Sequence, residues 1–176
     1  MSKKYQLTNE IKQFKNKVTN KVTILYRIRA LRNFDDVKAG DLGGFIEKEI
    51  NLSHEGNCWV YDDAWVYGHA RVSENAKIRH QSQVCGQVYG NAQICDQAFI
   101  SQYAKIYDNA RVSKNAYAYG SVYGKAQVSH TVKVWGRVCG RAKLNRQSKI
   151  REVPQNKEVS KSDILMEIIE KIETKE

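Results

Sequence analysis

The segment from Ala64 to Gln87, AWVYGH-ARVSEN-AKIRHQ-SQVCGQ, decides the fold because it repeats one six-residue unit four times. Each unit begins with Ala or Ser, has Val or Ile at its third position and ends in polar residues or glycine. Six residues are too few to bury an apolar face alone, so consecutive units must stack on one another. Positions one and three share parity and point to the same side of a short strand. The pattern therefore predicts a solenoid with a narrow interior of small and β-branched side chains.

The repeat continues from Cys58 to Ile150, and its exceptions indicate how many units form one turn. Three units have four residues instead of six, and they begin at Val88, Val122 and Val138. If three units make one turn, all three short units fall on the same side of the coil. The spacing therefore favours a three-sided solenoid with one side built from the shortened units.

The units of this chain follow the pattern A-x-[VI]-x-[GDS]-N. This pattern resembles the repeats of the hexapeptide-repeat superfamily. The preceding segment, LYRIRALRNFDDVKAGDLGGFIEKEINLSHEGNCWVYDDAWVYG at 25–68, is similar to the N-terminal module of hexapeptide proteins from phages and prophages, which carry hypothetical-protein or transferase labels. The resemblance covers roughly residues 20–152. It implies an all-β fold, a left-handed parallel β-helix, and the left hand comes from the resemblance alone, because parallel crossovers are normally right-handed.

Composition shifts along the chain predict four segments. They are a β-rich capping module over 1–51, the hexapeptide β-helix over 52–153, a linker over 154–161 that starts at Pro154, and a C-terminal helix over 162–176. We expect Ser160 or Ser162 to cap that helix. Its apolar stripe would consist of Ile164, Leu165, Ile168, Ile169 and Ile172. The helix either covers the last coil or packs against a sister chain.

Composition also indicates the class of protein and its compartment. No apolar run approaches the length of a membrane span and no hydrophobic segment follows Met1, so we expect a cytoplasmic protein of a bacterial host without membrane association. The chain has four cysteines and no C-x-x-C pair. We therefore expect reduced thiols, with no disulfide framework, metal or cofactor.

Positive charge is concentrated near the end of the repeat. The chain carries a net charge of +10, and residues 136–161 contain eight basic residues and two acidic ones. The predicted site for a polyanion or an acidic partner comprises Arg137, Arg141, Lys143, Arg146, Lys149 and Arg151. The alternatives are solubility, or pairing with the acidic C-terminal segment.

Outward positions on one predicted side are aromatic. They are Trp65, Tyr67, Phe99, Tyr117, Tyr119 and Trp135. A monomer would leave this stripe in water, so we expect a contact surface. The resemblance implies a homo-oligomer, a dimer or trimer packed side to side. Stacking of nucleic-acid bases on the rings is the alternative.

Histidine is the residue on which an enzymatic function depends. Hexapeptide acyltransferases, which the chain resembles, use a histidine between subunits as general base. The weak catalytic candidates are His80 and His130, which share one corner of the coil but lie three coils apart, about 14 Å at the usual strand spacing. That separation excludes a metal shared by the two within one chain. The sequence contains no P-loop and no G-x-S-x-G motif.

These observations predict a non-catalytic phage or prophage protein that acts by binding. Its target would be a nucleic-acid-associated or acidic partner, for example as an anti-CRISPR-like inhibitor of a host nucleoprotein. The alternatives are an acyltransferase-like enzyme with an inter-subunit histidine, and a structural or assembly component.

Overall fold

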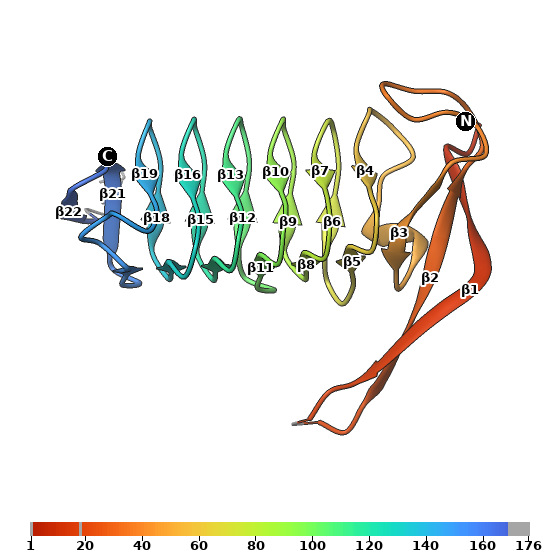
Figure 1. Ribbon diagram of the computed structural model, residues 1–176, viewed down its shortest axis with the longest axis horizontal. Coiled ribbons are helices and arrows are strands. Elements are labelled where there is room, and N and C mark those ends of the chain that lie inside the picture. The colour runs from red at the N-terminus through yellow and green to blue at the C-terminus, as the bar shows by residue number, and fades with distance from the viewer. Residues whose placement is uncertain (1, 18, 169–176) are drawn as a thin grey trace, which may run out of the picture.

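The computed structural model describes residues 2–17 and 19–168, and in it the repeat forms an elongated rod of stacked coils (Figure 1). Three sheets of parallel strands run along the rod, one on each side. The predicted three-sided parallel β-helix is therefore confirmed. Within the described part of the chain, no helix has the length and apolar character needed to cross a membrane.

The three sides are named here by the residues that they present. The aromatic side is a nine-stranded sheet in the order β1 (Tyr5–Lys15), β2 (Val22–Ala30), β3 (Leu42–Ile46), β5 (Trp65–Val66), β8 (Gln83–Val84), β11 (Phe99–Ile100), β14 (Tyr117–Ala118), β17 (Lys133–Val134) and β20 (Glu152–Val153). The polar side comprises β4 (Trp59–Val60), β7 (Lys77–Ile78), β10 (Gln93–Ile94), β13 (Arg111–Val112), β16 (Gln127–Val128) and β19 (Lys143–Leu144). The short-unit side comprises β6 (Arg71–Val72), β9 (Gln87–Val88), β12 (Lys105–Ile106), β15 (Ser121–Val122), β18 (Arg137–Val138), β21 (Lys157–Lys161) and β22 (Ile164–Glu167). A short 3-10 helix, η1 (Glu49–Asn51), leads into the first coil.

The interior contains the residues that the repeat predicts. Third-position side chains stack in columns, so that Ile94 pairs with Ile78 on one side and Val112 on the other. First-position alanines, including Ala98 and Ala104, are fully buried between these columns. Each buried Val or Ile contributes about 1.5–3 kcal/mol of hydrophobic free energy, and the columns supply most of the core.

The shortened units lie on one side, as predicted, and the structure shows where two residues are missing. Val88 pairs with Val72 and Ile106, so it occupies a third-position slot rather than a first-position one. The deletion lies at the preceding corner, where a glycine replaces the usual longer turn at Gly86, Gly120 and Gly136. A Cβ atom on Gly120 would lie 2.0 Å from the carbonyl oxygen of Gly136. Only glycine allows the chain to turn this tightly.

The first coil is closed by the N-terminal segment. Lys4 is fully buried, and its Nζ donates to the carbonyl oxygen of Cys58 at 2.8 Å and to that of Glu55 at 3.3 Å. The Tyr5 hydroxyl donates to the Leu52 carbonyl oxygen at 2.8 Å. These donors satisfy carbonyl groups that no preceding coil can reach.

Strands β1 and β2 form an antiparallel hairpin that extends away from the rod as an arm (Figure 1). Near the end of the arm, the Phe14 ring stacks on Trp65 with centroids 5.4 Å apart and meets Tyr67 edge-on at 4.9 Å. The arm therefore covers the beginning of the aromatic side.

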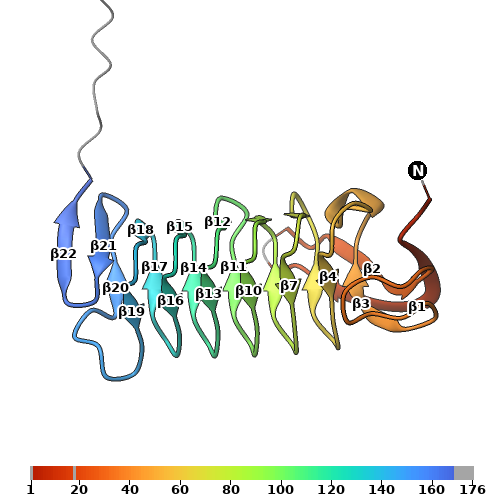
Figure 2. The same cartoon turned by 90° about the horizontal axis from the view of Figure 1, so that it is seen from above.

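The predicted C-terminal helix is wrong over the described residues. Residues 157–161, predicted as a linker, pair with β18 as strand β21, and β22 then pairs with β21 in antiparallel fashion (Figure 2). Val159 is fully buried and extends the column above Val138, so the open edge of β18 outweighs the helical spacing of Ile164 and Leu165. The Ser162 Oγ accepts a hydrogen bond from the Lys143 N–H instead of capping a helix. The part of the predicted helix over 169–176 lies outside the described residues.

Candidate functional site

Both candidate histidines lie at the corner between the polar and aromatic sides, here called the histidine corner. Its fifth-position residues form a column along the rod: Asp62, His80, Asp96, Lys114 and His130. Their φ angles lie between 53° and 62°, the left-handed region that Asn, Asp, His and Gly adopt more readily than other residues. The residues in this column are therefore explained first by the backbone turn, and a chemical role needs separate evidence.

In this column the Nδ1 atom of His80 accepts a backbone hydrogen bond from the next coil. The Asp62 Oδ2 accepts the His80 N–H at 2.9 Å, and the Asp96 Oδ2 accepts the Lys114 N–H at 3.0 Å. Between them, the His80 Nδ1 accepts the Asp96 N–H at 3.1 Å, so the imidazole replaces a carboxylate in the same pattern. A backbone amide can only donate, hence neutral His80 carries its proton on Nε2 and offers no lone pair there.

His130 is oriented differently. Its Nδ1 lies 3.0 Å from the Ser129 Oγ, which also lies 3.5 Å from the Leu144 carbonyl oxygen. The hydroxyl can donate to either partner, and donation to the Leu144 carbonyl would make the His130 Nδ1 the donor to Ser129. With Ser129 donating to Leu144, the lone pair of neutral His130 lies on Nε2, where a general base needs it.

The last coil lengthens the histidine corner beside His130. Four residues join the polar and aromatic strands in the preceding coil, 129–132, whereas seven residues, 145–151, do so in the last one. This loop contains three of the six predicted basic residues, Arg146, Lys149 and Arg151, all exposed. Arg151 donates to the Asn145 carbonyl oxygen at 3.4 Å and also to that of Arg146, which gives the loop a defined shape.

The other predicted basic residues lie elsewhere around the last coils. Arg137 is on the short-unit side, where it pairs across the sheet with Glu158, and Lys143 is on the polar side. Arg141 lies at the corner between those two sides. The six residues therefore surround the rod, and the structure gathers only the loop 145–151 group next to a candidate histidine.

The predicted aromatic stripe does line one side, in two parts. Phe14 of the arm packs on Trp65 and Tyr67, so that part is covered. Farther along, the Tyr119 and Trp135 rings stack at 3.9 Å with 6° between their planes, and the Trp135 Nε1 donates to the Glu152 Oε1 at 2.8 Å. Tyr117 and Trp135 are 40% and 42% exposed, which leaves the second part of the stripe in solvent.

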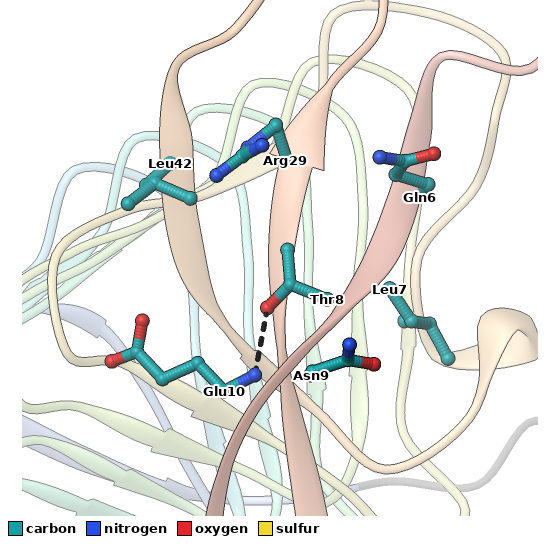
Figure 3. A pocket seen from close by; sticks show the side chains of 7 residues that line it. All are labelled: Gln6, Leu7, Thr8, Asn9, Glu10, Arg29 and Leu42. Carbon is teal, nitrogen blue, oxygen red and sulfur yellow. Dashed lines mark hydrogen bonds between the residues drawn. The ribbon is translucent and has the colours of Figure 1, made fainter.

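Open cavities occur away from His80 and His130. A cavity of about 450 Å³ beside Trp135 is lined by Gly120, Ser121, Trp135, Gly136, Arg137, Gln155, Asn156 and Ile168. Another, of about 410 Å³, lies on the N-terminal strands (Figure 3) and is lined by Gln6, Leu7, Thr8, Asn9, Glu10, Arg29 and Leu42. Neither cavity includes His80 or His130 among its lining residues, so a single chain does not enclose either imidazole in these cavities.

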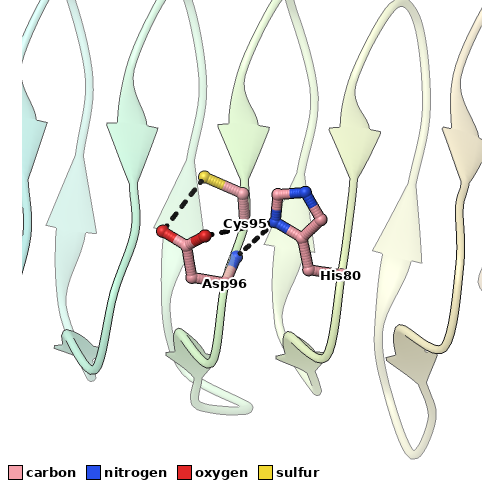
Figure 4. Close-up of side chains that lie close together, drawn as sticks. All are labelled: His80, Cys95 and Asp96. Carbon is pink, nitrogen blue, oxygen red and sulfur yellow. Dashed lines mark hydrogen bonds and ion pairs between the residues drawn. The ribbon is translucent and has the colours of Figure 1, made fainter.

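One cluster of potential ligands was not predicted from the sequence. His80, Cys95 and Asp96 come together because one coil here contains 16 residues, which places residues that far apart in the same layer of the corner (Figure 4). The burial of Asp96 alone would raise its pKa, but the Lys114 N–H bond and the nearby Lys114 and His80 hold that pKa below its usual value. Burial raises the pKa of the Cys95 thiol. The sequence could have revealed the cluster, because the short unit at Val88 shortens this coil to 16 residues and so aligns His80 with Asp96.

Comparison with known proteins agrees with the fold. No protein-family model matches the chain. A curated protein of Escherichia coli (strain K12), named "Uncharacterized acetyltransferase YdcK", is 39% identical over 90 residues, a match that covers 49% of this chain and 28% of that protein. Together with the stacked coils, this similarity is consistent with the left-handed β-helix of the hexapeptide-repeat superfamily. The chain has the architecture of a hexapeptide-repeat β-helix protein.

The same similarity bears on function. It favours the acyltransferase-like alternative over the predicted non-catalytic binding protein. It gives no support to a phage origin, an inhibitory role or a nucleic-acid partner, which stay predictions.

Proposed function

We propose that this protein belongs to an acyl-transfer system and that His130 is its general base. The observation that carries the proposal is the 3.0 Å contact between the His130 Nδ1 and the Ser129 Oγ, from which we infer the tautomer with its lone pair on Nε2. The acetyltransferase name of the similar Escherichia coli protein supports the reaction class. His80 is excluded as the base because its Nδ1 accepts a backbone N–H.

The reaction follows from this orientation. The Nε2 of His130 takes the proton of an acceptor hydroxyl or amine while the acceptor oxygen or nitrogen attacks the thioester carbonyl carbon. A carbon–oxygen or carbon–nitrogen bond forms and the carbon–sulfur bond breaks. The imidazolium then returns the proton to the departing thiolate, so no charge is left on the enzyme. Such a base contributes about 10²–10⁴-fold to the rate.

The basic loop would hold the donor. Acyl donors such as coenzyme A thioesters carry phosphate groups, and Arg146 and Lys149 present exposed positive charge on the loop at the corner that also holds His130. Arg151 supports that loop through its bonds to backbone carbonyl oxygens. We assign donor binding to Arg146 and Lys149, and loop shape to Arg151.

The site is open in one chain, and a second chain would complete it. His130 lies on the corner next to β17, and the exposed stripe residue Trp135 follows in the same coil. Association of chains through the exposed part of the stripe would place a neighbouring chain beside this corner and exclude water from the imidazole.

The experiment measures thiol release from acetyl-coenzyme A with a panel of hydroxyl and amine acceptors. The protein is compared with the variants His130→Gln and His80→Asn, and thermal unfolding confirms that each variant is folded. We expect His130→Gln to reduce kcat at least 100-fold and His80→Asn to retain it. Equal turnover in the His130→Gln variant, or wild-type protein that neither binds nor turns over acetyl-coenzyme A, would rule the proposal out.

A further inference from the structure

A second chemically distinctive group lies two to three coils from His130 on the same corner. The donor atoms of His80, Cys95 and Asp96 all lie within 4.8 Å of one another (Figure 4). The group contains a nitrogen, a sulfur and an oxygen ligand, the set that zinc and its neighbours in the first transition row accept. Nothing in the proposed acyl transfer uses it.

The distances agree with a single ion. With zinc–nitrogen bonds of about 2.0 Å and zinc–sulfur bonds of about 2.3 Å, ligand atoms of a tetrahedral site lie roughly 3.3–3.8 Å apart. Here the His80 Nδ1 is 3.2 Å from the Asp96 Oδ1, and the Cys95 Sγ is 3.9 Å from the Asp96 Oδ2. These distances run to different oxygens of Asp96, and the His80 Nδ1 and Cys95 Sγ lie within 4.8 Å of each other, so rotation of the His80 and Asp96 side chains is needed to bring the three ligands around one ion.

Bonds to the backbone already orient the ligands. The His80 N–H is held by Asp62, and the Asp96 Oδ2 accepts the Lys114 N–H at 3.0 Å. Cys95 is only 4% exposed, so its thiol has a fixed direction, whereas the His80 side chain is 54% exposed and leaves an approach from solvent. Ligands oriented in this way before binding lose little conformational freedom when they coordinate an ion.

The charges around the cluster are compatible with a divalent cation. The Arg111 Nη2 lies 3.7 Å from the Cys95 Sγ. Its positive charge favours the thiolate form of Cys95, which is the form that binds a metal. Lys114 lies 3.7 Å from the Asp96 carboxylate and repels a free cation. A thiolate and a carboxylate together neutralise the two positive charges of the ion, so Lys114 then faces a neutral site.

We propose that His80, Cys95 and Asp96 form a binding site for a zinc-like divalent transition-metal ion, with solvent as the fourth ligand. Binding replaces the hydrogen bond from the Asp96 N–H to the His80 Nδ1, and water takes up that exposed N–H. The thiol proton is released as the metal–sulfur bond forms. The site is separate from His130, so it does not depend on the proposed acyl transfer.

The full-length protein, reduced and freed of metals, is titrated with Co²⁺ alone and followed by absorption. We expect one equivalent to bind with a thiolate-to-cobalt charge-transfer band and the visible bands of four-coordinate cobalt, and Zn²⁺ to displace it. Cys95→Ser should abolish the charge-transfer band and weaken Zn²⁺ binding at least about 100-fold, since even changes outside the ligands cost 10–100-fold. His80→Asn should have the same effect on affinity. Asparagine keeps a side-chain oxygen for the Asp96 N–H, as the carboxylates of this column do, so the variant is expected to fold.

Matched controls exist in the same repeat. His130→Gln changes the histidine in the same column three coils on, and Cys139→Ser changes another buried cysteine on a different side. Both variants should bind Co²⁺ as the wild type does. Three results would each overturn the assignment: no cobalt uptake by wild-type protein, uptake without a thiolate band, or a band that survives Cys95→Ser.

Discussion

Position five of each unit shows how one backbone conformation restricts the residue that occupies it. Most of these corners have a positive φ, which the chain adopts at Gly68, Gly90, Asp96 or His80 in different coils. Aspartate adds a bond to the next coil, as Asp108 does to the Gly124 N–H at 3.1 Å. Histidine is therefore found at this position because it tolerates the turn, and whether it can act as a base depends on what its Nδ1 atom contacts.

The tight corners give a prediction at single residues. Gly120→Ala places a Cβ atom 2.0 Å from the Gly136 carbonyl oxygen, and backbone on both sides prevents relaxation. We expect a loss of about 3 kcal/mol in the free energy of unfolding, at the upper end of overpacking. Urea denaturation measures it. Gly68→Asn is the control, because a side chain there meets open space and Asn tolerates the positive φ. Equal stability of the two variants would contradict the tight-corner explanation.

Lys4 gives a second prediction, in which the sign of the pH dependence matters. Burial lowers the pKa of Lys4 from its ordinary 10.5, although the Cys58 thiol partly opposes that shift. Between the lowered and ordinary pKa values the unfolded chain binds more protons than the folded chain. The contribution of Lys4 to stability therefore rises with pH and falls as pH drops through the folded pKa.

Lys4→Met leaves carbonyl groups of the first coil without donors and should cost about 2 kcal/mol.

The measurement is urea unfolding of both proteins at a series of pH values that approaches the ordinary lysine pKa of 10.5 from below. The difference in the free energy of unfolding, wild type minus Lys4→Met, should increase with pH over this window. A difference that stays constant would mean that Lys4 has the same pKa in the folded and unfolded chains.

At the scale of elements, the β-helix could be predicted almost completely, because each unit fixes its own interior residues. Ala98 and Ile100 are buried because the first and third positions of a unit point to the same, inner side of the strand. The C-terminal strand could not be predicted in this way. Its identity depends on the unpaired edge of β18, a partner that the spacing of Ile164 and Leu165 does not reveal. The group of His80, Cys95 and Asp96 was missed for a similar reason, since these residues adjoin only once the short unit at Val88 sets the length of that coil.

The arm supplies the prediction at this scale. Phe14 attaches it to the coil through Trp65 and Tyr67, and such aromatic pairs contribute about 0.5–1.5 kcal/mol each beyond their buried area. Phe14→Ala should speed hydrogen exchange of the arm amides in β1 and β2 while the exchange of β8 to β17 is unchanged. Ile11→Ala is the control, because Ile11 is 50% exposed on the same strand. Similar exchange in both variants would show that pairing between β1 and β2 alone positions the arm.

At the scale of the whole molecule, the aromatic stripe and His130 are linked by position. The arm covers the first part of the stripe, so only the part around Tyr117 and Trp135 is open to another chain. That part shares its last coil with His130 and adjoins the histidine corner. Self-association through it would therefore assemble the proposed acyl-transfer site.

This link predicts that oligomeric state and turnover change together. Tyr117→Ser combined with Trp135→Ser removes the largest exposed apolar area of the stripe, and the protein should become monomeric by sedimentation equilibrium because interface aromatics dominate association free energy. Thiol release from acetyl-coenzyme A should fall with the monomer fraction, while thermal unfolding stays near that of the wild type. The exposed Tyr103, 79% accessible on the corner between β11 and β12 and not one of the stripe residues, provides the control variant Tyr103→Ser, which should remain associated and active. A monomeric double variant with full turnover would place the complete site in one chain. A wild-type protein that is itself monomeric would instead remove the stripe as an oligomer interface and leave the orientation of His130 to be tested alone.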